Sequence, residues 1–455
     1  MKNIQSMTDK KVLVVGLGKS GIAATEAMIK LGAKVAVQDS KKEADTDEAL
    51  ISFLKANNVE MFLGHLPKDL SCFDMLILSP GVNPELDFVQ EAQNHGAEIV
   101  GELEIAYRLA KGTFVALTGT NGKTTTTTLV GEIFEESQYN SYVVGNIGVA
   151  VISKALETVD DDWLVTETSS FQLQTIKEFR PVVSAILNIT PDHLNRHHTM
   201  ENYGLAKANI FANQSEDEYC VINGDDEFCV RLAQKCKAKV VYFSSTRELE
   251  TGAFLRDGDL VLVTEEGQDI HLCNKSELRV LGKHNIENAL AAAAICYYSG
   301  IDVEVIRKVL KAFVGVEHRM EFCREVNGIK YYNDSKGTNV DAALTALSAL
   351  EKNVILIAGG DGKSQDFVPF IENFNGSVKH MVLIGRDAKI IAEAAEKCGF
   401  KDYSFGKDME ECVKKCHELA EEGDNVLLSP ACASWDMYKN FEQRGDHFKG
   451  LVASL

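Results

Sequence analysis

The chain has 455 residues, of which 45% are hydrophobic and 25% charged, a balance typical of a water-soluble globular protein with two to four domains. Its formal net charge of −20 argues against a general nucleic-acid binder, which would need a basic face. No apolar run is long enough for a transmembrane helix, and the first residues lack the apolar segment and cleavage site of a signal peptide. We therefore expect a cytoplasmic protein without membrane insertion.

The first block of the chain predicts a βαβ arrangement. Lys11–Val15 is a short apolar run before glycines, which predicts a buried parallel strand. Ser20–Leu31 predicts a helix, and Lys34–Gln38 predicts the next strand. A further strand at Asp74–Leu78 ends at Ser-Pro-Gly. This alternation indicates an α/β domain.

The rest of the chain continues the alternation of strands and helices. Strands are predicted next at Phe114–Leu117, Trp163–Thr166 and Val183–Leu187. Glu250–Leu272 predicts short strands with a turn at Asp257-Gly258, and Leu290–Tyr297 predicts a helix too short to span a bilayer. The last strands are expected at Lys330–Asn333, Val354–Ala358, Met381–Ile384 and Val426–Leu428. We place three α/β domains at residues 1–110, 111–316 and 317–455.

Eleven cysteines are scattered along the chain without a CxxC pair, which suits a reducing cytoplasm. Cys412 and Cys416 lie one helical turn apart and are followed by His417. We expect reduced thiols on a helix there rather than a metal site.

The most specific motif is TGTNGKT at Thr118–Thr124, between a predicted strand and a predicted helix. Its glycines would let backbone N–H groups close around phosphate oxygens, Lys123 would reach the β- and γ-phosphates, and the Thr124 hydroxyl would bind Mg²⁺. Leu117 stands where the usual Walker pattern has its first glycine, so this is a variant P-loop. The strand–loop–helix context favours nucleotide binding over a turn with a solvated lysine.

A second glycine motif, GLGKSG at Gly16–Gly21, follows the first strand, and Asp39 comes 23 residues after Gly16. Taken alone this is a dinucleotide fingerprint, with Asp39 placed for a ribose. The pattern says only that a phosphate can approach a helix N-terminus. With a P-loop downstream we expect another phosphorylated ligand, such as a UDP-sugar, and NAD is the alternative.

Lys207 breaks the pattern of the helix predicted at Asn202–Asn213. It lies on an apolar stripe, four residues from both Tyr203 and Phe211. A buried lysine is costly unless it is paired or chemically changed. A lysine that extends its ammonium to solvent is the alternative.

Glu167 ends a predicted strand, and Asp192 and His193 follow another. Side chains at the carboxyl ends of parallel strands point into the crevice where ligands bind. With the P-loop they could hold Mg²⁺ between nucleotide and substrate. Ordinary cap or loop roles remain open for both Glu167 and His193.

Positive charge gathers at further glycine-flanked strand ends, from Arg319, Lys336 and Lys363. Single lysines there are usually solvated, but several at equivalent places indicate an anionic substrate. The segments concerned are GKHNIEN (282–288), His318-Arg319, NDSKGTN (333–339) and GGDGKS (359–364).

The chain resembles the Mur ligases over nearly its whole length, because a series of short segments occurs in the same order in both. The matching segments are TGTNGKT, ETSSFQL (167–173), LNITPDH (187–193), GKHNIEN, HRM, NDSKGTN, GGDGKS and SPACASWDMYKNFEQRG (429–445). The resemblance implies an ATP-dependent amide-forming ligase with a Rossmann-like N-terminal domain, a central P-loop ATPase sheet and a Rossmann-like C-terminal domain. It implies D-glutamate and UDP-N-acetylmuramoyl-L-alanine as substrates in peptidoglycan synthesis, by way of an acyl phosphate, and we expect a monomer.

The resemblance also implies roles for single residues. ATP would be bound by Gly119, Thr120, Asn121, Gly122, Lys123, Thr124, Thr125, Asn285, Asn288, Arg319 and Asp334. Two Mg²⁺ ions are expected, with the metal ligands Thr124, Glu167, His193 and Lys207, the last as a carbamate. Catalysis would involve Lys123, Lys207, His193 and Lys336. The substrates would contact Ser20, Asp39, Gly81, Asn146, Thr338, Lys363, Ser434 and Phe441. Trp435 adjoins the expected glutamate pocket, where the family often has a smaller apolar residue.

Three alternatives stay open at this point. A related ligase such as a folylpolyglutamate synthetase shares the P-loop chemistry but should lack the N-terminal GxGxxG. A nicotinamide-dependent dehydrogenase would explain Gly16–Gly21 but not TGTNGKT. A non-catalytic nucleotide-binding regulator would tolerate replacement of Glu167, His193 and Lys207.

Overall fold

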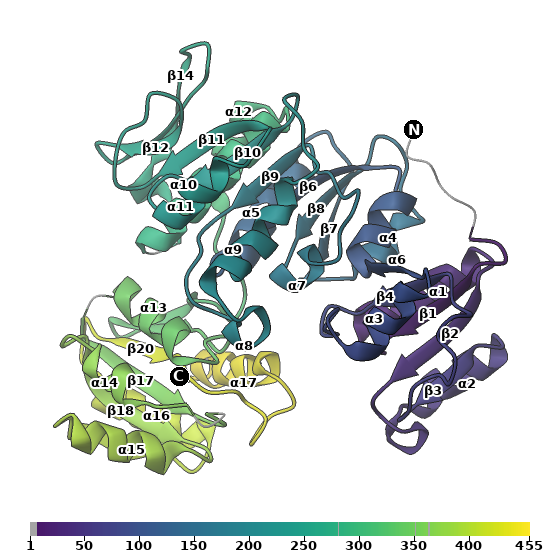
Figure 1. The fold of residues 1–455 in the computed structure, drawn as a ribbon. Coiled ribbons are helices and arrows are strands. Elements are labelled where there is room, and N and C mark those ends of the chain that lie inside the picture. The colour runs from purple at the N-terminus through teal and green to yellow at the C-terminus, as the bar shows by residue number, and fades with distance from the viewer. Residues whose placement is uncertain (1–6, 281, 351, 363–364) are drawn as a thin grey trace. The chain divides into compact units, whose positions relative to one another are not determined.

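The computed structural model describes residues 7–280, 282–350, 352–362 and 365–455 (Figure 1). Within these residues the backbone forms three sheets, as an α/β fold with three domains requires. The chain divides into two compact units. The first runs to Glu277 and takes in Ile286–Lys311, and the second comprises Leu278–Asn285 and Ala312–Leu455.

The N-terminal sheet has the order β3-β2-β1-β4-β5, and its strands are parallel. The strands are β1 (Lys11–Val15), β2 (Lys34–Asp39), β3 (Glu60–Leu63), β4 (Met75–Leu78) and β5 (Glu98–Gly101). The helices are α1 (Lys19–Lys30), α2 (Glu48–Ala56) and α3 (Asp87–Asn94), with a short 3₁₀ turn at Glu43–Asp45. Val12 and Val14 join one buried cluster while Leu13 and Val15 join another. Both faces of the sheet are therefore covered, as the continuous apolar run predicted.

The central sheet has the order β14-β13-β12-β11-β10-β9-β6-β8-β7. The strands are β6 (Thr113–Thr118), β7 (Ser141–Gly145), β8 (Trp163–Glu167), β9 (Val183–Ile186), β10 (Tyr219–Asn223), β11 (Lys239–Ser244), β12 (Gly252–Arg256), β13 (Asp259–Val263) and β14 (Asp269–Asn274). β12, β13 and β14 pair antiparallel, with the predicted turn at Asp257-Gly258 between β12 and β13, and the other neighbours pair in parallel. The carboxyl ends of β6, β8 and β9 therefore meet at one edge of the sheet.

Helices around this sheet are α4 (Glu102–Leu109), α5 (Lys123–Glu136), α6 (Val151–Ala155), α7 (Ser170–Leu173), α8 (Leu194–His197), α9 (Met200–Ala208), α10 (Glu227–Ala233), α11 (Lys283–Tyr298) and α12 (Val303–Ala312). Short 3₁₀ turns lie at Asn209–Phe211 and Lys275–Glu277. The prediction of one continuous helix at Asn202–Asn213 was wrong, because the α-helix ends at Ala208 and the chain tightens into the 3₁₀ turn. The alanine-rich middle of α11, Ala289–Cys296, is fully buried, which explains a helix that is apolar on all sides.

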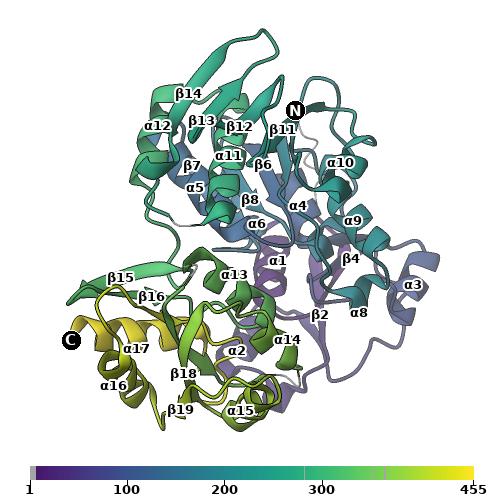
Figure 2. The same cartoon turned by 90° about the vertical axis from the view of Figure 1, so that its left-hand side faces the viewer.

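The C-terminal sheet has the order β15-β16-β20-β17-β18-β19, and its antiparallel edge strand β15 was not predicted. The strands are β15 (Glu321–Val326), β16 (Ile329–Asn333), β17 (Val354–Gly359), β18 (Val378–Ile384), β19 (Tyr403–Phe405) and β20 (Asn425–Leu428). The helices are α13 (Val340–Leu350), α14 (Val368–Glu372), α15 (Ala388–Lys397), α16 (Met409–Leu419) and α17 (Phe441–Ala453). Helices α13 to α15 cover one face and α16 and α17 the other (Figure 2).

Cys412 and Cys416 lie buried on the inner face of α16 and form no disulfide, and the helix predicted there is confirmed. No helix in the described part of the chain has the length and apolar character that crossing a membrane requires.

Candidate active site

The TGTNGKT loop joins β6 to α5, as the sequence predicted. Gly122 has φ +80°, and a Cβ there would lie 2.4 Å from Oδ1 of Asn288. That oxygen also accepts a 3.1 Å hydrogen bond from the Thr126 hydroxyl. Glycine is therefore required by the backbone conformation and by the close approach of α11, which brings Asn288 to the loop.

Asn188, which follows β9, braces the same loop. Its Oδ1 accepts from the Asn121 N–H at 2.8 Å, and its Nδ2 donates to the Asn121 carbonyl at 3.1 Å. Its carbonyl oxygen accepts from the Thr120 N–H at 3.0 Å. This role of Asn188 was not predicted, although pairing of β6 with β9 in a parallel sheet brings the two loops together.

Lys207 lies beside the loop with only 2% of its surface exposed. Its Nζ donates to the Gly119 carbonyl at 2.7 Å and to the Thr118 hydroxyl at 3.3 Å, and it lies 4.8 Å from the centre of the Tyr203 ring. Burial, and then the charge of Lys123, hold the pKa of Lys207 well below its usual range. The ammonium does not reach solvent, so the anomaly seen in the sequence is a real buried amine.

Glu167 ends β8 and is also buried, with 1% exposed. Its Oε1 accepts a 2.8 Å hydrogen bond from Nδ2 of Asn146. Its Oε2 is buried and has no hydrogen-bond partner among the residues that the structure describes. A buried carboxylate oxygen without a partner is costly, and it fits a bound cation. Its charge acts to raise the pKa of Lys207, against the larger effects of burial and Lys123.

His193 is more exposed than Glu167, with 48% of its side chain accessible. It has φ +52° and its Nε2 lies 3.4 Å from Oδ2 of Asp192. Its ring lies 4.8 Å from that of Phe171, in α7. In the described part of the chain, no three His, Cys, Asp or Glu side chains form a cluster that could hold a metal ion.

Two residues next to His193 were missed by the sequence analysis. His197 is buried, with its Nε2 3.0 Å from the Ser170 hydroxyl, and burial lowers its pKa to about 4, so it stays neutral. Arg196 donates to the carbonyls of Gly81 and Val82 at 3.4 and 2.9 Å. Arg196 thus ties the turn after β4, which contains Gly81, to the segment that follows β9.

The N-terminal glycine loop lets its own backbone segments pack closely together. Gly16 has φ +87°, and a Cβ on Gly21 would lie 1.8 Å from the Gly16 carbonyl oxygen. Asp39 accepts from the N–H groups of Leu17 and Lys41 at 2.7 and 2.9 Å, so its carboxylate shapes the loop. Ser20 lies in the first turn of α1, where N–H groups and the helix dipole favour an anion.

In the second unit, Asp334 follows β16 and is buried. Its Oδ2 accepts from the Ser429 hydroxyl at 2.6 Å, and its Oδ1 accepts from the Met320 N–H at 3.3 Å. Burial raises the pKa of Asp334 to about 6, although Ser429 and then Arg319 act to lower it. The Nε of Arg319 is buried and has no hydrogen-bond partner among the described residues. Asn285, at the start of α11, is buried in the same unit.

Lys336 and Phe441 lie together, with the Lys336 Nζ 5.7 Å from the ring centre. Ser434 is buried, and its carbonyl accepts from the N–H groups of Met437 and Tyr438 at 3.1 and 2.8 Å. Thr338 is half-buried, and its N–H donates to the Lys336 carbonyl at 2.9 Å. Lys363 lies outside the described residues, and Trp435 is 66% exposed.

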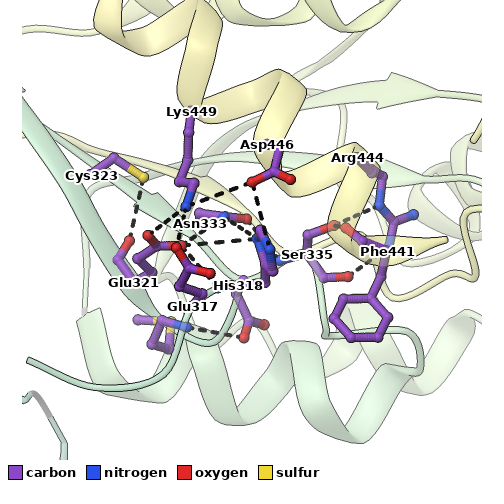
Figure 3. A network of polar contacts seen from close by, with 12 residues as sticks. Glu317, His318, Glu321, Cys323, Asn333, Ser335, Phe441, Arg444, Asp446 and Lys449 are labelled. Atoms are coloured by element: carbon purple, nitrogen blue, oxygen red, sulfur yellow. Dashed lines mark hydrogen bonds and ion pairs between the residues drawn. The ribbon is translucent and has the colours of Figure 1, made fainter. Parts of the chain in front are cut away.

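Arg444, another residue that the sequence analysis missed, joins these segments from α17 (Figure 3). It is buried and donates to the Ser335 hydroxyl and carbonyl at 2.9 and 2.7 Å, and to the Cys432 carbonyl at 3.1 Å. The Ser335 hydroxyl in turn donates to the Phe441 carbonyl at 2.8 Å. One guanidinium therefore holds the backbone next to both Asp334 and Lys336.

Comparison with known proteins identifies this architecture. Residues 10–101 match the Mur ligase MurD-like N-terminal domain, 117–296 the Mur ligase middle domain, and 318–432 the Mur ligase glutamate ligase domain. A protein of Alkaliphilus oremlandii named UDP-N-acetylmuramoylalanine–D-glutamate ligase is 49% identical over 99% of both chains. The chain belongs to the Mur ligase family. A Clostridioides difficile protein of the same name is 49% identical over 98% of this chain and 99% of its own.

Solved structures of other ligases share the fold at low identity. A pseudomurein peptide ligase type C from Methanothermus fervidus has a TM-score of 0.58 at 19% identity, covering 98% of this chain and 100% of its own. The UDP-N-acetylmuramate-alanine ligase of Thermotoga maritima has the same TM-score and identity, covering 98% of this chain and 99% of its own. The Mur ligase fold is thus found over nearly the whole chain.

Proposed function

We propose that the chain is an ATP-dependent ligase that joins D-glutamate to UDP-N-acetylmuramoyl-L-alanine during peptidoglycan precursor synthesis. Relatives with 49% identity over nearly their full length carry the name of this ligase. The observation that carries the chemistry is the buried pair beside the P-loop, Glu167 with its partnerless oxygen and Lys207 with its lowered pKa.

ATP binding is assigned to the P-loop of the first unit. The residues are Gly119, Thr120, Asn121, Gly122, Lys123, Thr124 and Thr125, with Asn288 beside them. Asn285, Arg319 and Asp334 are also proposed to contact ATP. The partnerless Nε of Arg319 supports this assignment, because a buried guanidinium suits an anionic or polar ligand.

Magnesium fits the residues around Lys207. Thr124, Glu167, His193 and a carbamate on Lys207 would hold two ions, which would offset the negative charge of the phosphates and the substrate carboxylate. A carbamate forms on a neutral amine, and the lowered pKa of Lys207 favours the neutral form. The carbamate also resolves the cost of a buried lysine, because it replaces the cation with a carboxylate-like group.

The reaction must activate a carboxylate, because an acid and an amine do not condense in water. The γ-phosphoryl group of ATP passes to the terminal carboxylate of UDP-N-acetylmuramoyl-L-alanine and gives an acyl phosphate. The D-glutamate amine then attacks the acyl carbon, and phosphate leaves. Lys123 and Lys336 offset the charge that this phosphoryl transfer brings together.

Substrate binding is assigned by the same reasoning to two groups. Ser20, Asp39 and Gly81 would hold the uridine diphosphate, and Asn146 the muramoyl-alanine arm. Thr338, Lys363, Ser434 and Phe441 would hold D-glutamate. We propose a cytoplasmic monomer whose domains comprise residues 1–110, 111–316 and 317–455.

The deciding experiment measures ADP release with ATP, Mg²⁺ and UDP-N-acetylmuramoyl-L-alanine. D-glutamate, L-glutamate, L-alanine, L-lysine and diaminopimelate are offered in turn. Release only with D-glutamate supports the proposal. Release with another amino acid keeps the ligase chemistry and overturns the specificity, and no release with any of them overturns both.

A further inference from the structure

Glu102, the first residue of α4, is buried far from water and is not used in the reaction proposed above. Only 2% of its surface is exposed. Its Oε1 accepts a 2.6 Å hydrogen bond from the Ile152 N–H, and its carboxyl also interacts with the Val151 N–H, at the start of α6. Its Oε2 is buried without a hydrogen-bond partner among the residues described. The carboxyl group therefore interacts with the first two N–H groups of α6.

The segment before α6 wraps around Glu167. Asn146 donates from its backbone N–H to the Glu167 carbonyl at 2.9 Å, and from Nδ2 to Glu167 Oε1 at 2.8 Å. The Gly145 N–H closes the loop on the Val149 carbonyl at 2.9 Å, and a Cβ on Gly145 would lie 2.2 Å from the Glu167 carbonyl oxygen. The loop is therefore held at one end by β7 and at the other by α6.

We propose that Glu102 is a positioning residue for Glu167, acting through the start of α6 and the loop that carries Asn146. This rests on the proposed role of Glu167 in binding Mg²⁺. Helix α6 has only five residues, and so short a helix has little stability of its own. Without the Glu102 carboxyl, its first N–H groups lose their acceptor. The freed loop would then no longer fix Oε1 of Glu167.

The hydrogen bonding of Glu102 to the start of α6 does not depend on the charge of its carboxyl group. Burial raises the pKa of this carboxyl to about 7, so both protonation states are populated near neutrality. Oε1 can accept from the Ile152 N–H in either state. An uncharged side chain of equal length should therefore replace Glu102, whereas a shorter one should not.

Glu104 is a matched control two residues further along α4. It is fully buried and accepts from the N–H groups of Lys177, Glu178 and Phe179 at 2.8, 3.0 and 3.1 Å. It also accepts from Arg108 Nε at 2.8 Å. Glu104 ties α4 to a different segment. Replacing it therefore shows how much metal binding changes when α4 is destabilised without a change at α6.

The test measures Mn²⁺ binding by electron paramagnetic resonance in the presence of a non-hydrolysable ATP analogue. Glu102→Ala should raise the dissociation constant about tenfold, the lower end of the range for residues that orient metal ligands. Glu102→Gln should bind like the wild type, and Glu104→Ala should change binding less than twofold. The double variant Glu102→Ala with Asn146→Ala should bind no more weakly than Asn146→Ala alone.

An equal effect of Glu104→Ala and Glu102→Ala would overturn the proposal, and so would additive effects in the double variant. If Glu102→Ala does not fold, a marked loss of Mn²⁺ binding in Glu102→Gln overturns it instead. The binding measurement needs no turnover. Failure of the wild type to release ADP with D-glutamate would therefore show separately that the proposed reaction is wrong.

Discussion

Lys123 and Lys207 donate to the same acceptor, the carbonyl oxygen of Gly119, at 2.8 and 2.7 Å. Two amines that share one oxygen in a buried place cannot both be charged without strong repulsion. Lys207 is the more buried, and the charge of Lys123 helps to lower its pKa. The charge of Lys123 therefore adds to burial in favouring the neutral form of Lys207.

Replacing Lys207 tests the carbamate. Lys207→Ala should lower kcat by about a thousandfold or more, because the carboxylate-like group would be lost. Added acetate or propionate should restore part of the rate by filling the space with a free carboxylate. The exposed Lys414→Ala is the control, and it should keep full activity without responding to these acids. A fully active Lys207→Ala enzyme would contradict the assignment.

Two glycines of α17 should respond in opposite directions to the same substitution. A Cβ on Gly445 would lie 2.2 Å from Nδ1 of His318 and 3.0 Å from Nδ2 of Asn333, whereas one on Gly450 meets nothing within 4 Å. Gly445→Ala should lower the free energy of unfolding by about 1–3 kcal/mol through overpacking. Gly450→Ala should raise it by about 0.5–1 kcal/mol, since alanine favours helix. Calorimetric melting temperatures check both signs, and shifts of the same sign would contradict the packing described.

Arg444→Lys should be far from conservative. The buried guanidinium serves three acceptors on Ser335 and Cys432, and burial already lowers its pKa to about 10. An ammonium cannot reach all of them, so we expect a loss of about 2–4 kcal/mol in chemical denaturation. The exposed Arg324, which donates to the Ala453 carbonyl, supplies the control substitution Arg324→Lys. If Arg444→Lys lowers the free energy of unfolding no more than Arg324→Lys does, the hydrogen bonds of Arg444 do not stabilise these segments.

The sequence predicted the P-loop context and the unusual place of Lys207 because both signals are local. The P-loop has a strand before it and a helix after it, and Lys207 interrupts an apolar stripe within one helix. Arg196, His197 and Arg444 carry no such pattern, because their partners lie far away in the chain. Arg444 and Ser335 are 109 residues apart, and Arg196 and Val82 are 114.

Edges of the fold were predicted less well than its core. Buried strands such as β1 and β17 are continuous apolar runs, and they were found within one residue of their bounds. Strand β15 has the sequence EFCREV and has no buried residue. It is held by pairing with β16, which its composition does not reveal.

The stability of the wild type should depend on pH through Glu102. The pKa of this carboxyl rises from 4.5 to about 7 on folding, so its contribution to stability is fully present below pH 4.5 and is lost as the pH rises to 7. Relative to Glu102→Gln, the wild type should lose about 2 kcal/mol between about pH 5.5 and pH 8. The opposite slope, or none, would contradict the raised pKa.

Fluorescence of Trp163 can follow this unfolding in a Trp435→Phe background. The chain has two tryptophans. The ring centre of Trp163 lies 5.2 Å from that of Phe134 and 5.3 Å from that of Tyr139. It lies in the same unit as Glu102. The signal therefore reports the unit in which the titrating group is buried.

The hairpin at the edge of the central sheet offers a place to attach a probe. Asp257 and Gly258 form a two-residue turn with φ +50° and +93°, between β12 and β13. Three strands, β11, β10 and β9, separate β12 from β6 and its P-loop. An epitope or fluorophore peptide inserted at this turn should be carried without loss of ligase activity. Such a labelled enzyme would allow single molecules to be immobilised and watched during turnover.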